Sequence, residues 1–203
     1  LLAAADPDRG RHDAAQSRWP DIRCVTDAAA AITGMKPDIA CIATPGSARL
    51  KLAEAAVEAG VKLLFCEKPL AASGEDAEKI AGLCREAGIP LAVNLSRRWE
   101  PGCVRTAGMI ADGAIGRPRR AIGLYTRGIN NNAAHLVDLV HWWLGQTADY
   151  EITGRTVADA PDFRLRTETN TAMLLVTHDE DVAGKCDRVL QLEQGRLSEP
   201  LAH

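Results

Sequence analysis

Along the first half of the chain, short apolar stretches alternate with longer stretches in which apolar residues recur every three or four positions. The short stretches predict buried strands, and the longer ones predict helices that pack against them. The expected strands lie at 1–5, 22–25, 39–43, 61–66 and 91–93. Asp27 is expected to cap one helix, and Gly60 and Gly88 to end two others. This alternation predicts βαβ units and a parallel, doubly wound sheet.

The pattern changes after Asn94. Helices are expected over 97–112 and 131–144, with a strand over 120–126 between them. Gly145 directly follows the second helix and is expected to end it. These elements indicate a second domain of the α+β class.

Composition and charge exclude several functions. The 203 residues include 24 basic and 27 acidic side chains, a formal net charge of −3. This balance provides no attraction to nucleic acid or to an anionic membrane, and no apolar run is long enough to span a bilayer. We therefore expect no nucleic-acid partner and no membrane insertion. Because the chain opens without Met, inside an apolar run, we expect its true start to be missing.

The cysteines are scattered singly, and none stands at a zinc-ligand spacing from another cysteine or a histidine. They are Cys24, Cys41, Cys66, Cys84, Cys103 and Cys186. We expect small buried thiols, no metal site and a cytoplasmic protein, because the cytoplasm keeps such thiols reduced.

The residues that directly follow the expected strands are candidates for ligand binding, because ligands of open α/β sheets bind beyond the carboxyl ends of the strands. They are Asp6, Thr44, Pro45, Glu67, Lys68 and Asn94. A carboxylate such as Asp6 can accept hydrogen bonds from the ribose hydroxyls of a dinucleotide. An Asp-Pro pair after a strand is also a common turn.

Lys68 lies between Glu67 and Pro69, in short and stiff backbone at the end of a strand. An ammonium held there can polarise or protonate a substrate oxygen. The alternative is an ordinary surface lysine in a turn.

Three polar residues share one face of the expected helix over 131–144. Asn131, His135 and Asp138 stand at i, i+4 and i+7. A histidine that titrates near neutrality is the usual group for proton transfer. The alternative is a packed or surface histidine.

Taken together, these motifs resemble the Gfo/Idh/MocA oxidoreductase family over about residues 1–165. The motifs are Ala43-Thr44-Pro45, Cys66-Glu67-Lys68-Pro69-Leu70-Ala71, Arg98-Trp99-Glu100-Pro101, Gly113-x-x-Gly116 and His135-x-x-Asp138 followed by Trp143-Leu144-Gly145. The resemblance implies an α/β fold class, with an incomplete Rossmann-like parallel sheet followed by part of an α+β substrate and oligomerisation domain. The expected domains are a dinucleotide-binding domain over 1–95, a partial substrate domain over 96–168 and a tail over 169–203.

The resemblance also implies an activity: hydride transfer between NAD or NADP and a secondary alcohol of a sugar, sugar nucleotide or cyclitol, in a homo-oligomer. Carried over residue by residue, Lys68 and His135 are catalytic. Arg98, Asn131 and Asp138 bind substrate. The cofactor-binding residues are Asp6, Thr44, Pro45, Glu67, Lys68 and Asn94. NAD is favoured because a carboxylate at Asp6 repels a 2′-phosphate.

Two features depart from the family pattern. Asn131 stands where the family often has an aspartate, and an amide cannot take a proton from a hydroxyl. No G-x-G occurs in the sequence, so the turn that holds a pyrophosphate is absent. We expect a truncated chain with impaired activity.

The segment from 171 to 197 is similar to the C-terminal end of ABC transporter ATPase subunits. Thr171–Thr177 would be an apolar strand that delivers His178 to a γ-phosphate, with a helix and a hairpin strand after it. The phosphate-binding loop and the acidic pair for Mg²⁺ are absent. The alternative is that Thr171–Thr177 is another strand of the second domain. A nucleotide-binding fragment of a transporter ATPase and a catalytically silent fragment therefore remain as competing hypotheses.

Overall fold

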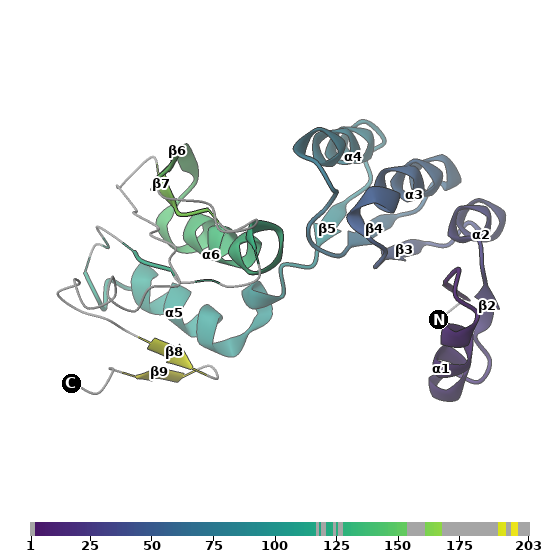
Figure 1. Ribbon diagram of the computed structural model, residues 1–203, viewed down its shortest axis with the longest axis horizontal. Helices are drawn as coiled ribbons and strands as arrows, with labels where there is room; N and C mark the ends of the chain where they lie inside the picture. Colours follow the sequence, from purple (N-terminus) through teal and green to yellow (C-terminus); the bar gives the residue numbers. More distant parts are fainter. Residues whose placement is uncertain are drawn as a thin grey trace. The chain divides into compact units, whose positions relative to one another are not determined.

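The computed structural model describes residues 3–116, 118, 121–123, 125, 128–153 and 161–167, together with the backbone of 191–193 and 196–198. The chain divides into two compact units, Leu1–Asn94 and Leu95–His203. Figure 1 labels their helices and strands. No described helix combines the length and the apolar character that crossing a membrane requires.

The first unit alternates strands and helices, which confirms the predicted α/β class. Its elements are β1 (Ala3–Ala5), α1 (Gly10–Arg18), β2 (Arg23–Val25), α2 (Ala28–Met35), β3 (Ile39–Ile42), α3 (Gly46–Ala59), β4 (Leu63–Cys66), α4 (Gly74–Glu86) and β5 (Leu91–Val93). The predicted helix ends are confirmed. The Asp27 carboxylate accepts a hydrogen bond from the Ala30 amide at 3.0 Å, and Gly60 ends α3 with φ 73° in the left-handed region.

All described strand pairs of the first unit are parallel, but they form two sheets. β1 pairs with β2, and a second sheet has the order β3-β4-β5. A doubly wound sheet of order 3-2-1-4-5-6 has one strand between these two groups. No described strand pairs with the outer edge of β1 or with the outer edge of β3, so the central position of a Rossmann-like sheet is not provided by the described residues.

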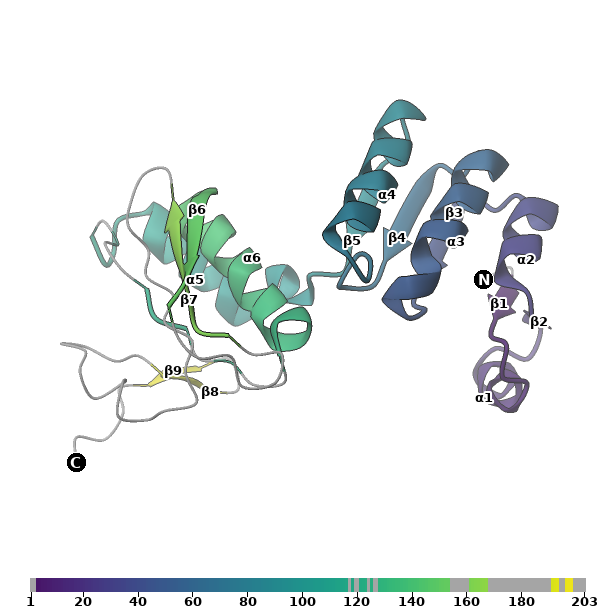
Figure 2. The same cartoon turned by 45° about the horizontal axis from the view of Figure 1, so that its top comes forward.

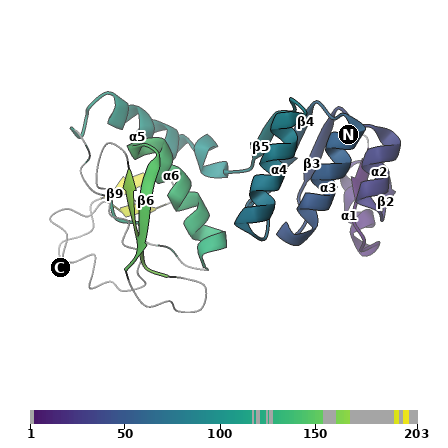
Figure 3. The same ribbon diagram turned by 90° about the horizontal axis from the view of Figure 1, so that it is seen from above.

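Helices α3 and α4 pack side by side on one face of β3–β5, and α2 lies beside α3 (Figures 1 and 3). Figure 2 shows α1 beside β1 and β2. The core under α3 and α4 contains the fully buried side chains Leu64, Cys66 and Ile80. The continuous apolar run at 39–43 predicts burial on both faces of β3. Instead, Ala40 and Ile42 are buried and Ile39 is 53% exposed, because the described helices cover one face.

The elements of the second unit are η1 (Ser96–Trp99, a 3₁₀ turn), α5 (Pro101–Ala111), η2 (Ile129–Ala133, a π-helical turn), α6 (Ala134–Leu144), β6 (Thr147–Ile152), β7 (Phe163–Thr167), β8 (Gln191–Glu193) and β9 (Arg196–Ser198). β6 pairs antiparallel with β7, and β8 with β9. The predicted helix over 97–112 is divided at Glu100, whose extended backbone (φ −73°, ψ 125°) is what a following proline imposes.

The strand predicted over 120–126 is wrong for the described part of this segment: 121–123 and 125 belong to no strand. A side chain at Gly123 would collide with Leu136 of α6, and Tyr125 is buried with Val140 and Phe163. Gly123 and Tyr125 are therefore used for packing on α6 and β7. Apolar patterning alone does not distinguish this packing from strand pairing.

Three of the described cysteines, Cys66, Cys84 and Cys103, are buried as expected. Cys24 is half-buried and Cys41 is exposed, because Cys41 lies on the face of β3 that the helices leave open. Among the described residues, no group of three metal-ligating side chains is placed to hold an ion.

Candidate functional site

The carboxyl ends of β3, β4 and β5 lie at one edge of their sheet. The Glu67 amide donates to the Ile42 carbonyl at 2.9 Å, and the Asn94 amide donates to the Cys66 carbonyl at 2.8 Å. These ladder bonds continue the parallel pairing by one residue on each strand. The strand-end candidates of the first unit's larger sheet are therefore brought to a common edge by backbone register alone.

Glu67 links two of the loops at this edge. Its Oε1 accepts a hydrogen bond from Asn94 Nδ2 at 2.5 Å, and its Oε2 accepts one from the Lys68 amide at 3.2 Å. All three residues are half-buried. The arrangement places a carboxylate and an amide side by side, both able to bind the polar groups of a ligand.

Thr44 follows β3 at the same edge. Its hydroxyl oxygen is buried and makes no hydrogen bond with the rest of the described protein. A buried hydroxyl without a partner is uncommon in folded proteins, and a ligand polar group is one way to satisfy it. Pro45 comes next, is exposed, and directly precedes α3.

Arg49 is a member of this edge that sequence reasoning missed. It lies in α3, is only 4% exposed, and donates from Nε and Nη2 to the Thr44 carbonyl at 2.9 and 2.6 Å. Its Nη1 donates to the carbonyls of Glu67 and Pro69. The signal was present in the sequence, because Arg49 stands at helical spacing from the buried Leu52, Ala53 and Ala56. A charged residue in an apolar stripe needs a specific partner.

Lys68 is half-buried in the turn after β4, and the peptide bond between Lys68 and Pro69 is cis. The two carbonyls that Arg49 Nη1 binds belong to the residues directly before and after Lys68. The backbone on both sides of this lysine is therefore held by Arg49.

Asp6 lies at the carboxyl end of β1, and its carboxylate is already engaged. Oδ1 accepts a hydrogen bond from the Asp8 amide at 2.9 Å, and Oδ2 pairs with Arg11 at 3.4 Å. The first contact is the Asx turn that an Asp-Pro sequence favours. Arg11 is exposed and Asp6 is half-buried, so this pair is weak.

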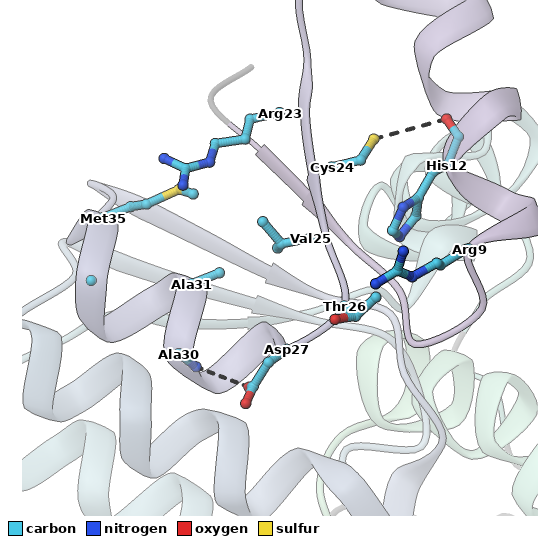
Figure 4. A pocket seen from close by; sticks show the side chains of 11 residues that line it. Arg9, His12, Arg23, Cys24, Val25, Thr26, Asp27, Ala30, Ala31 and Met35 are labelled. Carbon is cyan, nitrogen blue, oxygen red and sulfur yellow. Dashed lines mark hydrogen bonds between the residues drawn. The ribbon is translucent and has the colours of Figure 1, made fainter.

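A cavity of about 590 Å³ lies between α1, β2 and α2, as Figure 4 shows. Its lining mixes the cations Arg9 and Arg23 with Asp27 and with small apolar residues of α2. None of the strand-end candidates lines it. This cavity is therefore a feature separate from the strand-end candidates.

In the second unit, Arg98 and Asp138 bind each other. Arg98 Nε donates to both carboxylate oxygens at 2.9 Å, and Nη2 donates to Oδ1 at 2.7 Å. The Asp138 side chain is 8% exposed. Its hydrogen bond to Arg98 raises the pKa of that guanidinium above its usual value. The Arg98 guanidinium also lies 5.6 Å from the centre of the Trp142 ring, which fixes η1 against α6.

The common helix face predicted for Asn131, His135 and Asp138 holds only in part. His135 and Asp138 lie in α6, three residues apart, and share a face. Asn131 is exposed and lies in the π-helical turn η2, which follows Gly128 at φ 81°. A π-helical turn changes the angle between successive residues, so the α-helical spacing from Asn131 to His135 does not apply.

His178 and Thr171–Thr177 lie outside the described residues. The backbone hairpin of β8 and β9 is the described part of the tail. The interpretation of this tail as the end of an ABC transporter ATPase stays a prediction.

Parallel strands, helices on one face and polar residues at the carboxyl edge define a Rossmann-like α/β fold of the nucleotide-binding class. The Gfo/Idh/MocA family model, which describes an oxidoreductase family with an NAD-binding Rossmann fold, matches residues 1–95. This segment is therefore similar to the NAD-binding Rossmann domain of that oxidoreductase family.

Relatives extend the similarity into the second unit. The chain is 27% identical to D-apiose dehydrogenase of Paraburkholderia graminis, over 97% of the chain and 55% of the relative. It is 29% identical to inositol 2-dehydrogenase 4 of Saccharopolyspora erythraea, over 87% of the chain and 57% of the relative. The chain thus spans about half the length of the curated relatives it matches.

A solved structure agrees with the fold. An oxidoreductase from Agrobacterium radiobacter, in complex with NAD+, L-tartaric acid and magnesium, superposes with a TM-score of 0.77 at 25% identity. The match covers 87% of this chain and 58% of that one.

Proposed function

We propose that the chain carries the NAD-binding and part of the substrate-binding portion of a dehydrogenase that acts on a secondary alcohol of a sugar or cyclitol. The observation that carries the proposal is the cluster of Thr44, Glu67 and Asn94 beside Lys68, at the carboxyl edge of a sheet in the family-matching segment. The relatives named for D-apiose and inositol support the substrate class.

The residues at the carboxyl edge fit the nicotinamide half of NAD. The Thr44 hydroxyl is buried without a protein partner, and Glu67 and Asn94 present an acceptor and a donor. Asp6 would bind the adenosine ribose, and its carboxylate favours NAD over NADP because it repels a 2′-phosphate. When bound, NAD supplies the acceptor for the substrate hydride. No G-x-G occurs in the chain, so we assign no residue to the pyrophosphate.

Lys68 and His135 are the proposed proton-transfer groups. The Lys68 ammonium would donate a hydrogen bond to the reacting hydroxyl and so favour its ionisation. His135 would take or return the proton at that oxygen, because imidazole titrates near neutrality. Asn131 would bind a substrate hydroxyl through its amide without accepting its proton.

Arg98 and Asp138 serve this proposal by holding each other. Every hydrogen bond described for the Asp138 carboxylate is donated by Arg98, and the pair ties η1 to the helix that bears His135. We therefore propose that they orient α6 for substrate binding. The cytoplasm and a homo-oligomer are the setting we propose, on the free thiols and on the resemblance to the oxidoreductase family.

Titration with NADH tests cofactor binding directly, read as energy transfer from the tryptophans. Weak but saturable binding is expected for the chain as it stands, because no residue is assigned to the pyrophosphate. Glu67→Gln removes a charged acceptor and is expected to weaken binding about tenfold. Glu58→Gln, on an exposed position of α3, is the matched control and is expected to leave binding unchanged. An absence of saturable binding by the unmodified chain contradicts the proposal and favours a silent fragment.

Turnover tests the catalytic roles. NAD+ is supplied with D-apiose or with inositol, and NADH formation is followed by absorbance. Lys68→Met and His135→Ala are each expected to lower kcat by about a hundredfold or more, with NADH binding unchanged. Lys51→Met replaces an exposed lysine of α3 and is expected to have no effect. Full activity in both site variants would refute the assignment.

A further inference from the structure

Arg49 is a buried cation that the proposed reaction does not use. All of its described partners are backbone carbonyls, those of Thr44, Glu67 and Pro69. No carboxylate of the described residues lies within ion-pair distance of it. Burying a guanidinium without a counter-ion is costly, so its presence here calls for a specific reason.

The position of Arg49 on α3 does not supply that reason. It is the fourth residue of the helix, near the N-terminus, and the first turn contains no acidic residue. The positive end of the helix dipole disfavours a cation there. The helix would therefore be more stable with a neutral residue at this position.

The carbonyls that Arg49 binds point to its role. Two belong to the residues on either side of Lys68, and the third, that of Thr44, lies in the loop after β3. A planar guanidinium has five donors in a fixed geometry and can hold several acceptors at once. One side chain thus joins the loops that follow β3 and β4, and the Lys68 turn is held at both of its ends.

A second contact joins the same two loops. A Cβ atom at Gly46 would lie 2.9 Å from the Ala72 nitrogen and 3.0 Å from the Ala71 carbonyl carbon. The start of α3 therefore approaches the chain after Pro69 as closely as a residue without a side chain allows. This contact is independent of charge.

We infer that Arg49 is a positioning residue for Lys68: together with Gly46 it clamps the loop after β4 onto the start of α3 and so fixes where the lysine ammonium is presented. We call these contacts the Arg49 clamp. The inference rests on the proposed function for the role of Lys68. The clamp itself is a property of the first unit and is measurable without cofactor or substrate.

Hydrogen exchange of the whole chain, read by mass spectrometry, tests the clamp. Arg49→Met keeps an unbranched apolar stem and removes the donors. The amides of 67–72 are expected to exchange about tenfold faster or more, because hydrogen bonds to a charged donor are lost from this turn. Arg49→Lys is expected to show an exchange rate between those of the unmodified chain and Arg49→Met, since an ammonium lacks the planar, forked donors of a guanidinium. Lys51→Met, on the same helix, should exchange at the rate of the unmodified chain.

Gly46→Ala provides a second variant that leaves the charge in place. It is expected to speed exchange over 70–72 through the clash with Ala71 and Ala72, so the test survives if Arg49→Met does not fold. Unchanged exchange at 67–72 in the folded variants overturns the clamp. Uniformly faster exchange across β3, β4 and β5 also overturns it, because that result describes general destabilisation.

The kinetic readout separates positioning from stability. With NAD+ and the sugar or cyclitol that the unmodified chain oxidises, Arg49→Met is expected to lower kcat by up to about a hundredfold, with partial recovery in Arg49→Lys. Equal losses of kcat in Arg49→Met and Arg49→Lys overturn the positioning role. If the unmodified chain neither binds NADH nor turns over, the proposed function fails, and the exchange data still decide whether the clamp exists.

Discussion

The two units place their polar residues by different means. In Leu1–Asn94, backbone register between parallel strands brings Thr44, Glu67 and Asn94 to one edge, above a core of apolar side chains. In Leu95–His203, a carboxylate and a guanidinium that are forty residues apart hold η1 against α6. The comparison teaches that sheet order alone can assemble a site, whereas a helical site needs a particular pair of side chains.

The two arginines make the same contrast. Arg49 is 4% exposed and is neutralised by no carboxylate of the described residues, only by carbonyl dipoles. Arg98 has a full carboxylate partner and keeps 42% of its side chain exposed. Because water solvates its exposed part and offsets the cost of the charge, Arg98 can hold η1 against α6 at the surface. Arg49 has almost no contact with water, so backbone carbonyls in fixed positions must solvate its charge instead.

Truncation of the apolar core is expected to have the largest effect. Leu64 on the central strand β4 has no exposed surface, and Leu64→Ala should lower the free energy of unfolding by about 2–5 kcal/mol, through lost burial and a cavity. Urea titration followed by far-UV circular dichroism measures it. Ile39→Ala, on the open face of β3, is the control and should cost less than about 1 kcal/mol. Equal losses would mean that both faces of the sheet are covered.

Removal of the Arg98 charge tests the second unit. Arg98→Met keeps the apolar stem but leaves the Asp138 carboxylate buried without its partner, so the expected loss is about 2–3 kcal/mol. Tryptophan fluorescence during urea unfolding reports it, because Trp99, Trp142 and Trp143 all lie in this unit. Arg97→Met breaks only a surface pair with Glu100 at 3.4 Å and should stay within about 0.5 kcal/mol. A similar loss of unfolding free energy in Arg98→Met and Arg97→Met would contradict the role of the Arg98–Asp138 pair in holding η1 against α6.

Alkaline pH should weaken the first unit through Cys66. Burial raises the pKa of this thiol from its ordinary 9.0 to about 11, against the opposing charge of Arg49. Since the folded pKa is the higher one, the contribution of the neutral thiol is complete below pH 9 and is lost as the pH rises towards 11.

The expected loss is about 1–2 kcal/mol over that interval. Stability measured by urea titration at several alkaline pH values should fall more steeply for the unmodified chain than for Cys66→Ala, in which this thiol cannot ionise. Parallel slopes would show that the thiol titrates at its ordinary value.

The smallest effect is expected on the open side of β6. Ile152 is 60% exposed although it pairs with the buried Phe163 of β7. Ile152→Thr should change the free energy of unfolding of the monomer by less than about 0.5 kcal/mol. Phe163→Ala, the cross-strand comparison, should cost about 3–5 kcal/mol. A large loss in Ile152→Thr, measured by fluorescence at low protein concentration, would mean that this side of the strand is packed.

The first unit was largely predictable because its signals are local. Apolar stretches, Asp27, Gly60 and Gly88 each mark an element or an end without reference to distant residues. The strand-end rule then selected Thr44, Glu67 and Asn94. Arg49 was not predicted because the strand-end rule considers only residues in loops, whereas this side chain reaches the loops from within a helix.

The second unit was less predictable because its apolar residues serve long-range packing. The segment 121–125 is apolar enough for a strand, yet Gly123 and Tyr125 are used against α6 and β7. The π-helical turn before α6 also cannot be recognised from helical spacing, because it depends on how the backbone of Ile129–Ala133 leads into the helix. The packing of Gly123 and Tyr125 is decided by neighbours far away in the sequence.

By itself, the sequence determined the βαβ order, the capped helix ends and the set of residues at the strand ends, because short-range sterics and apolar period specify them. Tertiary structure alone decided that Glu67 binds Asn94, that Arg49 holds the carbonyls around Lys68, and that Asp138 is occupied by Arg98. These contacts join residues from 18 to 40 positions apart. They form only when folding has brought their elements together, since a hydrogen bond stabilises its partners only at contact distance.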